Sequence, residues 1–291
     1  MMMTAIGLMS GTSLDGVDVA LIETDGKRVE RFGPSGYRPY TDKERGLLRQ
    51  ALTEAIDLPQ RDARPGILRE AERTVTIAHA EAVASFIAQN RITCEDIDIV
   101  GFHGQTVLHR PAQKMTVQIG DATALAKAIH IPVMHDFRAA DVAAGGQGAP
   151  FVPVYHRALA QSLEREGPMV VVNIGGVSNI TYIDGADTLI ACDTGPGNAL
   201  LDDYMFRKMS QPFDCEGRLA AQGTAGCDAR QPALLPFELT VHQNVLHSLC
   251  NLIGSCIGCG IDNGCRIEDG HVRIEAAFQQ SAVIQMFTLR R

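Results

Sequence analysis

The sequence predicts an α/β fold with an internal repeat. Apolar, strand-like runs alternate with segments of helical periodicity, which is typical of α/β architecture. Two segments about 160 residues apart share one pattern, in which an apolar strand, a Gly-rich polar turn and a second apolar strand end on Asp-Gly. The 291 residues suffice for two lobes, which we place at 1–165 and 166–291. Because aromatic residues make up only 5% and tryptophan is absent, the core must be aliphatic.

The first half predicts a hairpin followed by alternating helices and strands. Strands at 4–9 and 17–24 enclose the polar turn Ser10–Gly16. Further along, we expect helices at 43–56, 67–90, 122–129 and 156–166, and strands at 97–102 and 131–137. One apolar face of the second helix is formed by Leu68, Ala71, Val75, Ala78, Ala82, Val83, Phe86 and Ile87.

The second half repeats the hairpin and then changes character. Strands at 169–174 and 177–183 enclose Gly175-Gly176, a short strand covers 188–191, and a helix begins at Asn198. After Gly223, helical periodicity is poor and the sequence becomes rich in Gly and Cys. We expect 224–291 to be atypical, with an out-of-frame or truncated tail as the hypothesis.

Charge and composition exclude several function classes. The net charge is -8 and no Lys/Arg run exceeds a pair, which argues against nucleic-acid binding. The N-terminus lacks a signal-peptide pattern and no window is apolar enough for a membrane helix, so we expect a cytoplasmic protein without a membrane partner. A homodimer is compatible with these features.

Six of the eight cysteines fall between Cys215 and Cys265. A disulfide framework is not expected in a cytoplasmic chain of this length. Cys256 and Cys259 form a CxxC, but their companions are irregularly spaced, which disfavours a zinc site.

The turn MSGTSLDGVD could bind phosphate. A Gly- and Ser/Thr-rich turn between two strands presents several backbone N–H groups at one point, and such a nest suits phosphate oxygens. Asp15 could hold Mg²⁺, directly or through water, since hard cations take oxygen ligands. VVVNIGGVSNIT follows the same logic, and the pair suggests a nucleotide clamped between two lobes. The alternative is two ordinary hairpins. The residues expected at the nucleotide are Gly11, Thr12, Ser13, Leu14, Asp15, Gly16, Val17, Asp18, Gly175 and Gly176.

The segment CDTGPGNALLDD places a carboxylate beside the start of a helix. Asp193 follows a short strand, and Asn198 can cap the helix after the Gly-Pro-Gly turn. This position suits base catalysis or metal contact. The alternative is that Asp193 only satisfies turn amides.

Three polar clusters come after apolar strands, where α/β proteins usually build their sites. They are HGQT, QIGD and DFRAADVAAGGQGAP. Their amides, carboxylates and one Arg suit a hydroxyl-rich ligand that carries a carboxylate. The residues expected to bind it are His103, Gln105, Thr106, Gln118, Asp121, Arg138, Asp141, Gln147 and Asn198.

Taken together, these motifs resemble the anhydro-N-acetylmuramic acid kinase family. GLMSGTSLDGVD, GFHGQT, QIGD, DFR with GGQGAPFVP, NIGGVSN and DTGPGN occur in that family's order, within residues 5–223. The resemblance implies the two-lobed, duplicated fold of actin, hexokinase and Hsp70. It also implies an ATP-dependent kinase that opens 1,6-anhydro-N-acetylmuramic acid with water and yields N-acetylmuramic acid 6-phosphate, in peptidoglycan recycling.

Within this resemblance, Gly11–Asp18 matches the ATP-phosphate motif and Asp193 matches the catalytic base. The family's PKSTGR segment and late GGG loop are not found after Gly223. The alternatives are therefore an impaired fragment of such a kinase, or a kinase for a different small sugar.

Overall fold

The protein is described by a computed structural model covering residues 1–163, 167–174, 177–185, 187–222, 274–279 and 282–288. The chain divides into two compact units, Met1–Leu163 and Glu164–Arg291. Both units combine β-sheets with helices, which confirms the predicted α/β class.

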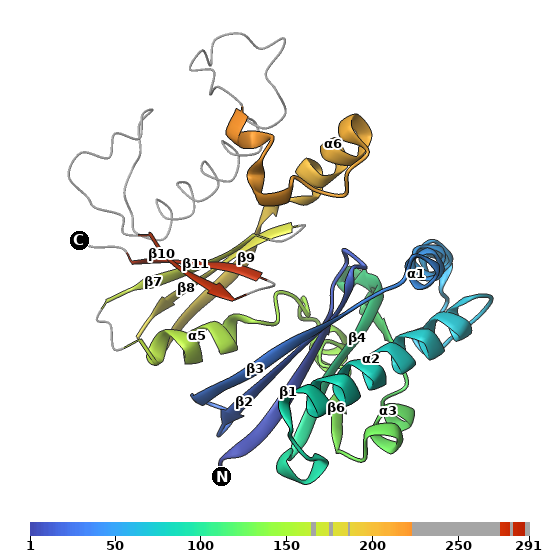
Figure 1. The fold of residues 1–291 in the computed structure, drawn as a ribbon, viewed down its shortest axis with the longest axis horizontal. Helices are drawn as coiled ribbons and strands as arrows, with labels where there is room; N and C mark the ends of the chain where they lie inside the picture. Colours follow the sequence, from blue (N-terminus) through green and yellow to red (C-terminus); the bar gives the residue numbers. More distant parts are fainter. Residues whose placement is uncertain (164–166, 175–176, 186, 223–273, 280–281, 289–291) are drawn as a thin grey trace. The chain divides into compact units, whose positions relative to one another are not determined.

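The first unit is built on a six-stranded mixed sheet (Figure 1). The order is β3-β2-β1-β4-β5, with β6 pairing with β4. Neighbouring strands are antiparallel except that β1 and β6 each run parallel to β4. The strands are β1 (Met3–Ser10), β2 (Gly16–Thr24), β3 (Val29–Pro39), β4 (Ile99–Arg110), β5 (Met115–Ile119) and β6 (Val133–His135).

Helix α2 lies across this sheet with α1 and α3 beside it (Figure 1). Of the eight apolar residues predicted on its inner face, seven are buried and Ile87 is partly buried. The helices and 3-10 turns of the unit are α1 (Asp42–Glu54), η1 (Ala55–Asp57), α2 (Leu68–Asn90), η2 (Cys94–Asp96), η3 (Pro111–Gln113), α3 (Ala122–Ile129), α4 (Ala139–Ala144) and α5 (Pro153–Gln161).

The second unit contains a five-stranded antiparallel sheet of order β10-β11-β7-β8-β9. Val170, Val172 and Ile180 form a small core against Tyr182 and Cys192. The described elements are β7 (Met169–Ile174), β8 (Val177–Asp184), β9 (Thr188–Pro196), α6 (Ala199–Met209), η4 (Cys215–Gly217), η5 (Ala220–Gln222), β10 (Ile274–Gln279) and β11 (Ala282–Thr288).

The structure corrects the sequence prediction at several elements. HGQT does not follow a strand but lies inside β4, which runs on to Arg110. The strand expected at 131–137 is limited to β6, and the strand expected at 188–191 continues to Pro196. Strands β3 and β5 and helix α4 were not predicted.

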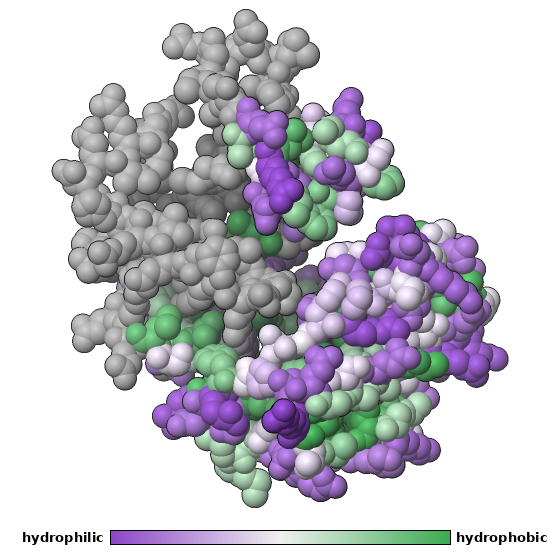
Figure 2. All heavy atoms as spheres, viewed as in Figure 1, coloured by the Kyte–Doolittle hydropathy of each residue, from purple (hydrophilic) through white to green (hydrophobic). Residues whose placement is uncertain are grey.

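Polarity varies over the face of the molecule seen in Figure 2 without forming a continuous apolar band on the described residues. None of the described helices is long and apolar enough to cross a membrane.

Candidate functional site

The predicted phosphate turn is a tight loop between β1 and β2. Leu14 donates its N–H to the Gly11 carbonyl (3.3 Å) and has a positive φ of 55° that buries its side chain in the core. Thr12 and Ser13 are exposed as a result. A Cβ on Gly16 would lie 2.4 Å from the Arg38 carbonyl oxygen, so only glycine fits there. The loop therefore turns its hydroxyls outward while its buried leucine anchors it.

Asp15 is exposed and held within this loop. Its Oδ1 accepts from the Ser13 hydroxyl (2.7 Å) and from the Gly16 N–H (3.1 Å). The Asp15 carbonyl accepts from the Tyr40 N–H (2.8 Å), and the Leu14 carbonyl accepts from Arg45 Nε (3.2 Å). The carboxylate therefore keeps a fixed direction with Oδ2 outside these two bonds. Such an oxygen fits a Mg²⁺ ligand, directly or through water.

A buried network joins the loop to β4. Ser10 pairs with Gln105 across the parallel β1–β4 contact, and both are 1% exposed. The Ser10 hydroxyl donates to Gln105 Oε1 (2.6 Å), and Gln105 Nε2 donates to the Gly11 carbonyl (3.2 Å). Because Ser10 has one hydroxyl hydrogen, the 3.0 Å contact with Tyr40 must have the phenol as donor. Burial raises the pKa of Tyr40 to about 12, which keeps that donor protonated.

Gln105 was predicted to bind the sugar, but the amide is buried and bonded within the protein. The geometry favours a positioning role at the start of the phosphate loop. Further along the loop segment, Val17 is buried in the core and Asp18 lies in β2 opposite Met9 and Tyr37.

Arg138 and His103 meet beside the loop of the GGQGAP segment. Arg138 Nη1 donates to the Gly148 carbonyl (2.7 Å) and Nη2 lies 3.2 Å from His103 Nε2. The Gly148 N–H donates to Asp141 Oδ2 (2.7 Å), which fixes that loop from the other side. Gly148 has φ +64°, and a Cβ there would lie 2.5 Å from Val142, so the close turn depends on glycine. Burial is the main cause that lowers the pKa of His103, followed by the Arg138 charge.

The remaining predicted sugar residues divide into structural and exposed positions. Gln118 Nε2 donates to the Thr106 hydroxyl across the β4–β5 pair (3.2 Å) and to the Thr116 hydroxyl within β5 (2.9 Å). Asp121 caps α3 by accepting from the Ala124 N–H (2.9 Å), so its carboxylate has a structural role. Gln147 is exposed.

A cavity of about 180 Å³ opens beside His103 and Gln118. Two ion pairs border it: Arg61 with Asp136, and Arg64 with Glu72 at 2.8 Å. Sequence reasoning did not single out Arg61, Arg64 and His135, which come from the segment before α2 and from the end of β6, and it included Asp136 only as the first residue of the DFR motif. The Arg61–Asp136 pair joins residues 75 positions apart, so no local pattern marks it.

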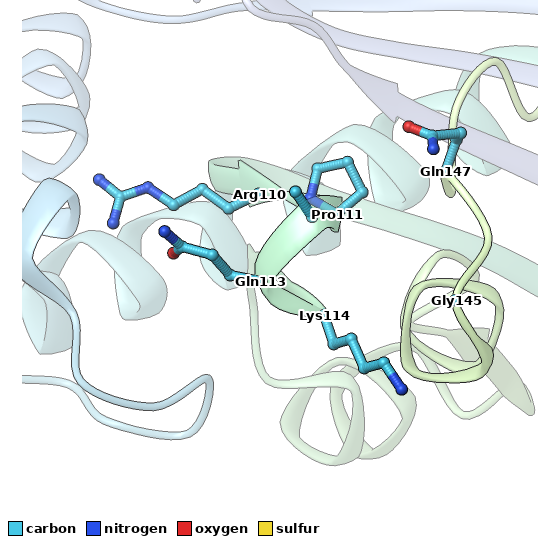
Figure 3. A pocket seen from close by; sticks show the side chains of 7 residues that line it. Arg110, Pro111, Gln113, Lys114, Gly145 and Gln147 are labelled. Carbon is cyan, nitrogen blue, oxygen red and sulfur yellow. The ribbon is translucent and has the colours of Figure 1, made fainter.

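A larger, open cavity of about 570 Å³ lies between the η3 turn and the loop after α4. Figure 3 shows that Arg110 and Gln113 extend away from the Gly145–Gln147 side while Lys114 extends in another direction. These side chains therefore do not converge on one point of the cavity.

In the second unit, Asp193 lies within β9 and is exposed. It pairs in register with Asn179 of β8, and the register shifts by one residue at the next pair, Ser178 with Gly195. Asn198 occupies the N-cap position of α6, as predicted, but its side chain makes no capping hydrogen bond. The predicted residues Gly175 and Gly176 lie outside the described residues.

Within the described part of the chain, no three His, Cys, Asp or Glu side chains gather as a metal-binding group. Cys94 and Cys215 are free thiols there. The CxxC at Cys256 and Cys259 lies outside the described residues.

Comparison with known proteins gives a family match. The model of the anhydro-N-acetylmuramic acid kinase family matches residues 3–231. An anhydro-N-acetylmuramic acid kinase of Rhodopseudomonas palustris (strain HaA2) is 84% identical over 225 residues, which are 77% of this chain and 61% of the relative. That of Bradyrhizobium diazoefficiens is 82% identical with the same coverage, and that of Methylorubrum extorquens is 54% identical over 78% of this chain and 63% of the relative. The chain thus spans about three fifths of the length of these relatives.

Among solved structures, a Ppx/GppA family member from Aquifex aeolicus is similar with a TM-score of 0.33 and 12% identity, over 72% of this chain and 56% of the other. The ethanolamine utilization protein EutJ from Carboxydothermus hydrogenoformans gives a TM-score of 0.34 and 12% identity, over 88% and 68%.

Proposed function

The chain belongs to the anhydro-N-acetylmuramic acid kinase family, and from this premise we propose that it is an ATP-dependent kinase for 1,6-anhydro-N-acetylmuramic acid. The supporting observation is the family match over residues 3–231, which includes the Gly11–Asp18 loop, the His103–Arg138 pair and Asp193. The product is N-acetylmuramic acid 6-phosphate, formed together with ADP in the recycling of cell-wall fragments in the cytoplasm.

The proposed reaction couples ring opening to phosphoryl transfer. Asp193 accepts a proton from water while the water oxygen bonds to C1 of the sugar. The C1–O6 bond breaks, O6 takes up the γ-phosphoryl group of ATP, and ADP leaves. A carboxylate is a weak base, but it suffices because C1 becomes oxocarbenium-like and the proton need only leave late.

The phosphate loop stabilises charge rather than reacting. The outward hydroxyls of Thr12 and Ser13, together with loop N–H groups, are suited to phosphate oxygens. Mg²⁺ would neutralise phosphate charge, with Asp15 as its candidate ligand. The buried Ser10–Gln105–Tyr40 network keeps the first residues of the loop in place.

The test is product formation by the full chain. Incubation with ATP, Mg²⁺ and the anhydro sugar should give a sugar phosphate by ³¹P NMR and the mass of N-acetylmuramic acid 6-phosphate. Phosphorylation of N-acetylglucosamine at the same rate would instead favour a kinase for another small sugar. Sugar binding without ADP release would show that the chain carries the sugar site but not a working nucleotide site.

A homodimer is part of the proposal. Light scattering should then give about twice the chain mass of 31.4 kDa.

A further inference from the structure

The Arg138 guanidinium is partly buried and makes only uncharged contacts among the described residues. It donates to the Gly148 carbonyl, faces His103 Nε2, and lies 5.9 Å from the centre of the Phe151 ring. No described carboxylate lies within ion-pair distance, whereas Arg61 and Arg64 nearby are both paired. Burial lowers the pKa of Arg138, and no anion offsets that effect. A partly buried cation without a counter-ion is costly, so this position favours an incoming anion.

His103 is fixed in one tautomer by its two neighbours. A guanidinium can only donate, so His103 Nε2 must accept from Arg138 and carry no hydrogen. The ring hydrogen is then on Nδ1, where it is donated to the Gly104 carbonyl at 2.8 Å. His103 therefore holds Arg138 only as a neutral ring, because a proton on Nε2 would remove the acceptor and place two cations together.

We propose that His103 is a positioning residue that orients Arg138 as the receptor for the carboxylate of the sugar, and that this receptor works only while His103 is neutral. The inference rests on the proposed function, because it names the part of the acidic sugar that this site takes. Asp141 fixes the loop that Arg138 contacts, because its carboxylate accepts a hydrogen bond from the Gly148 N–H.

Other charged groups face the same region and define the electrostatic setting of His103. Burial and then the Arg138 charge disfavour its protonation, and the charge of His103 in turn contributes to lowering the pKa of the buried His79. The backbone groups of Gly104 and Ser10 act in the opposite direction on the pKa of His103. The charged and titratable side chains around the adjoining cavity are Arg61, Asp62, Arg64, His135 and Asp136. The two guanidiniums there are already in ion pairs, so they do not replace Arg138 as the anion receptor.

The first test is the tautomer in the ligand-free chain, which needs no activity. Two-bond ¹H–¹⁵N correlation spectra, assigned by comparison with His103→Gln, should show Nδ1 protonated and Nε2 bare at about pH 7.5. The signal pattern should change in Arg138→Gln. A hydrogen on Nε2 at this pH would overturn the proposal.

The second test is calorimetric binding of N-acetylmuramic acid and N-acetylglucosamine, which differ by the lactyl carboxylate. The acidic sugar should bind at least about tenfold more tightly, and Arg138→Gln should remove that preference. Arg49→Gln, an exposed arginine of α1, is the matched control and should change nothing.

The pH dependence separates positioning from simple packing. Affinity for the acidic sugar should stay level above about pH 6.5 and fall at lower pH in the parent chain, because burial and the Arg138 charge lower the pKa of His103 from its ordinary value. His103→Gln keeps a neutral acceptor and should retain affinity with a flat pH profile, whereas His103→Phe should lose about tenfold at all pH values. Identical profiles for the parent and His103→Gln would refute the positioning role.

The outcomes also separate this proposal from the proposed function. Arg138-dependent preference for the acidic sugar without turnover would refute the kinase activity of the chain but support the receptor. Absence of an Arg138-dependent preference for the acidic sugar would overturn the receptor, whether or not the chain turns the sugar over.

Discussion

Replacing Gln105 by methionine removes the amide that joins β4 to the phosphate loop. Methionine keeps the length of the side chain but lacks Oε1, which accepts from the Ser10 hydroxyl, and Nε2, which donates to the Gly11 carbonyl. Gln105 and Ser10 are each 1% exposed, so the Ser10 hydroxyl loses its acceptor away from water. A buried polar group left without its partner costs about 1–3 kcal/mol. Because Ser10 retains its contact with Tyr40, we expect the first unit to lose about 1–2 kcal/mol of unfolding free energy, in the lower part of this range.

Urea unfolding followed by far-UV circular dichroism measures this loss. The matched control is Gln113→Met, the same substitution at an exposed position of the η3 turn, which should change stability by less than about 0.5 kcal/mol. ATP binding should weaken in Gln105→Met and not in the control. Equal unfolding midpoints for the two variants would refute the reasoning that Gln105 acts through a buried network.

Two further predictions concern pH and backbone geometry. Burial lowers the pKa of His79 to about 4, so the folded state excludes a proton that the unfolded chain takes up near 6.5. Stability is then complete above about pH 6.5 and falls as the pH drops towards 4, by about 2 kcal/mol from this group at pH 5. Melting temperatures that stay level from about pH 7 to 5 would contradict this. Gly120 has φ +140°, and a Cβ there would lie 2.4 Å from the Phe102 ring, so Gly120→Ala should cost more than about 2 kcal/mol in urea unfolding. Gly26→Ala, with no neighbour within 4 Å, should cost only about 1 kcal/mol, and equal losses would argue against the clash.

Segments with helical periodicity, and strands that flank a Gly-rich turn, could be predicted from the sequence. Helix α2 has one apolar face at helical spacing, and α3 was predicted over the residues it occupies, Ala122–Ile129. The two hairpins were found because each has apolar strands around a Gly-rich turn.

Other elements left no clear local pattern. Strand β3 is at the edge of its sheet, where exposed residues and Gly33 and Gly36 obscure the alternation. Helix α4 has six residues and ends at Gly145 with φ +99°, so the surrounding glycines suggested a loop. HGQT reads as polar, yet its Gln105 is buried inside β4 because the Ser10 hydroxyl and the Gly11 carbonyl satisfy its amide.

The candidate site could likewise be predicted only in part from the sequence. Residue types and motif order singled out candidate side chains, but they did not predict the contacts that those side chains make in the fold. Asp121 proved to be a helix cap and Asp141 holds the Gly148 N–H, roles that depend on contacts within the fold. The Arg61–Asp136 pair joins residues 75 positions apart, which no local pattern could predict.

The most direct test of the central claim is ADP release by the full chain with and without 1,6-anhydro-N-acetylmuramic acid, measured beside Asp193→Asn. Asp203→Asn is the matched control, since Asp203 is an exposed carboxylate that pairs with Arg207 on α6. We predict sugar-dependent ADP release that Asp193→Asn reduces by at least about a hundredfold and Asp203→Asn leaves unchanged. Equal sugar-dependent release by the parent chain and Asp193→Asn would contradict the account.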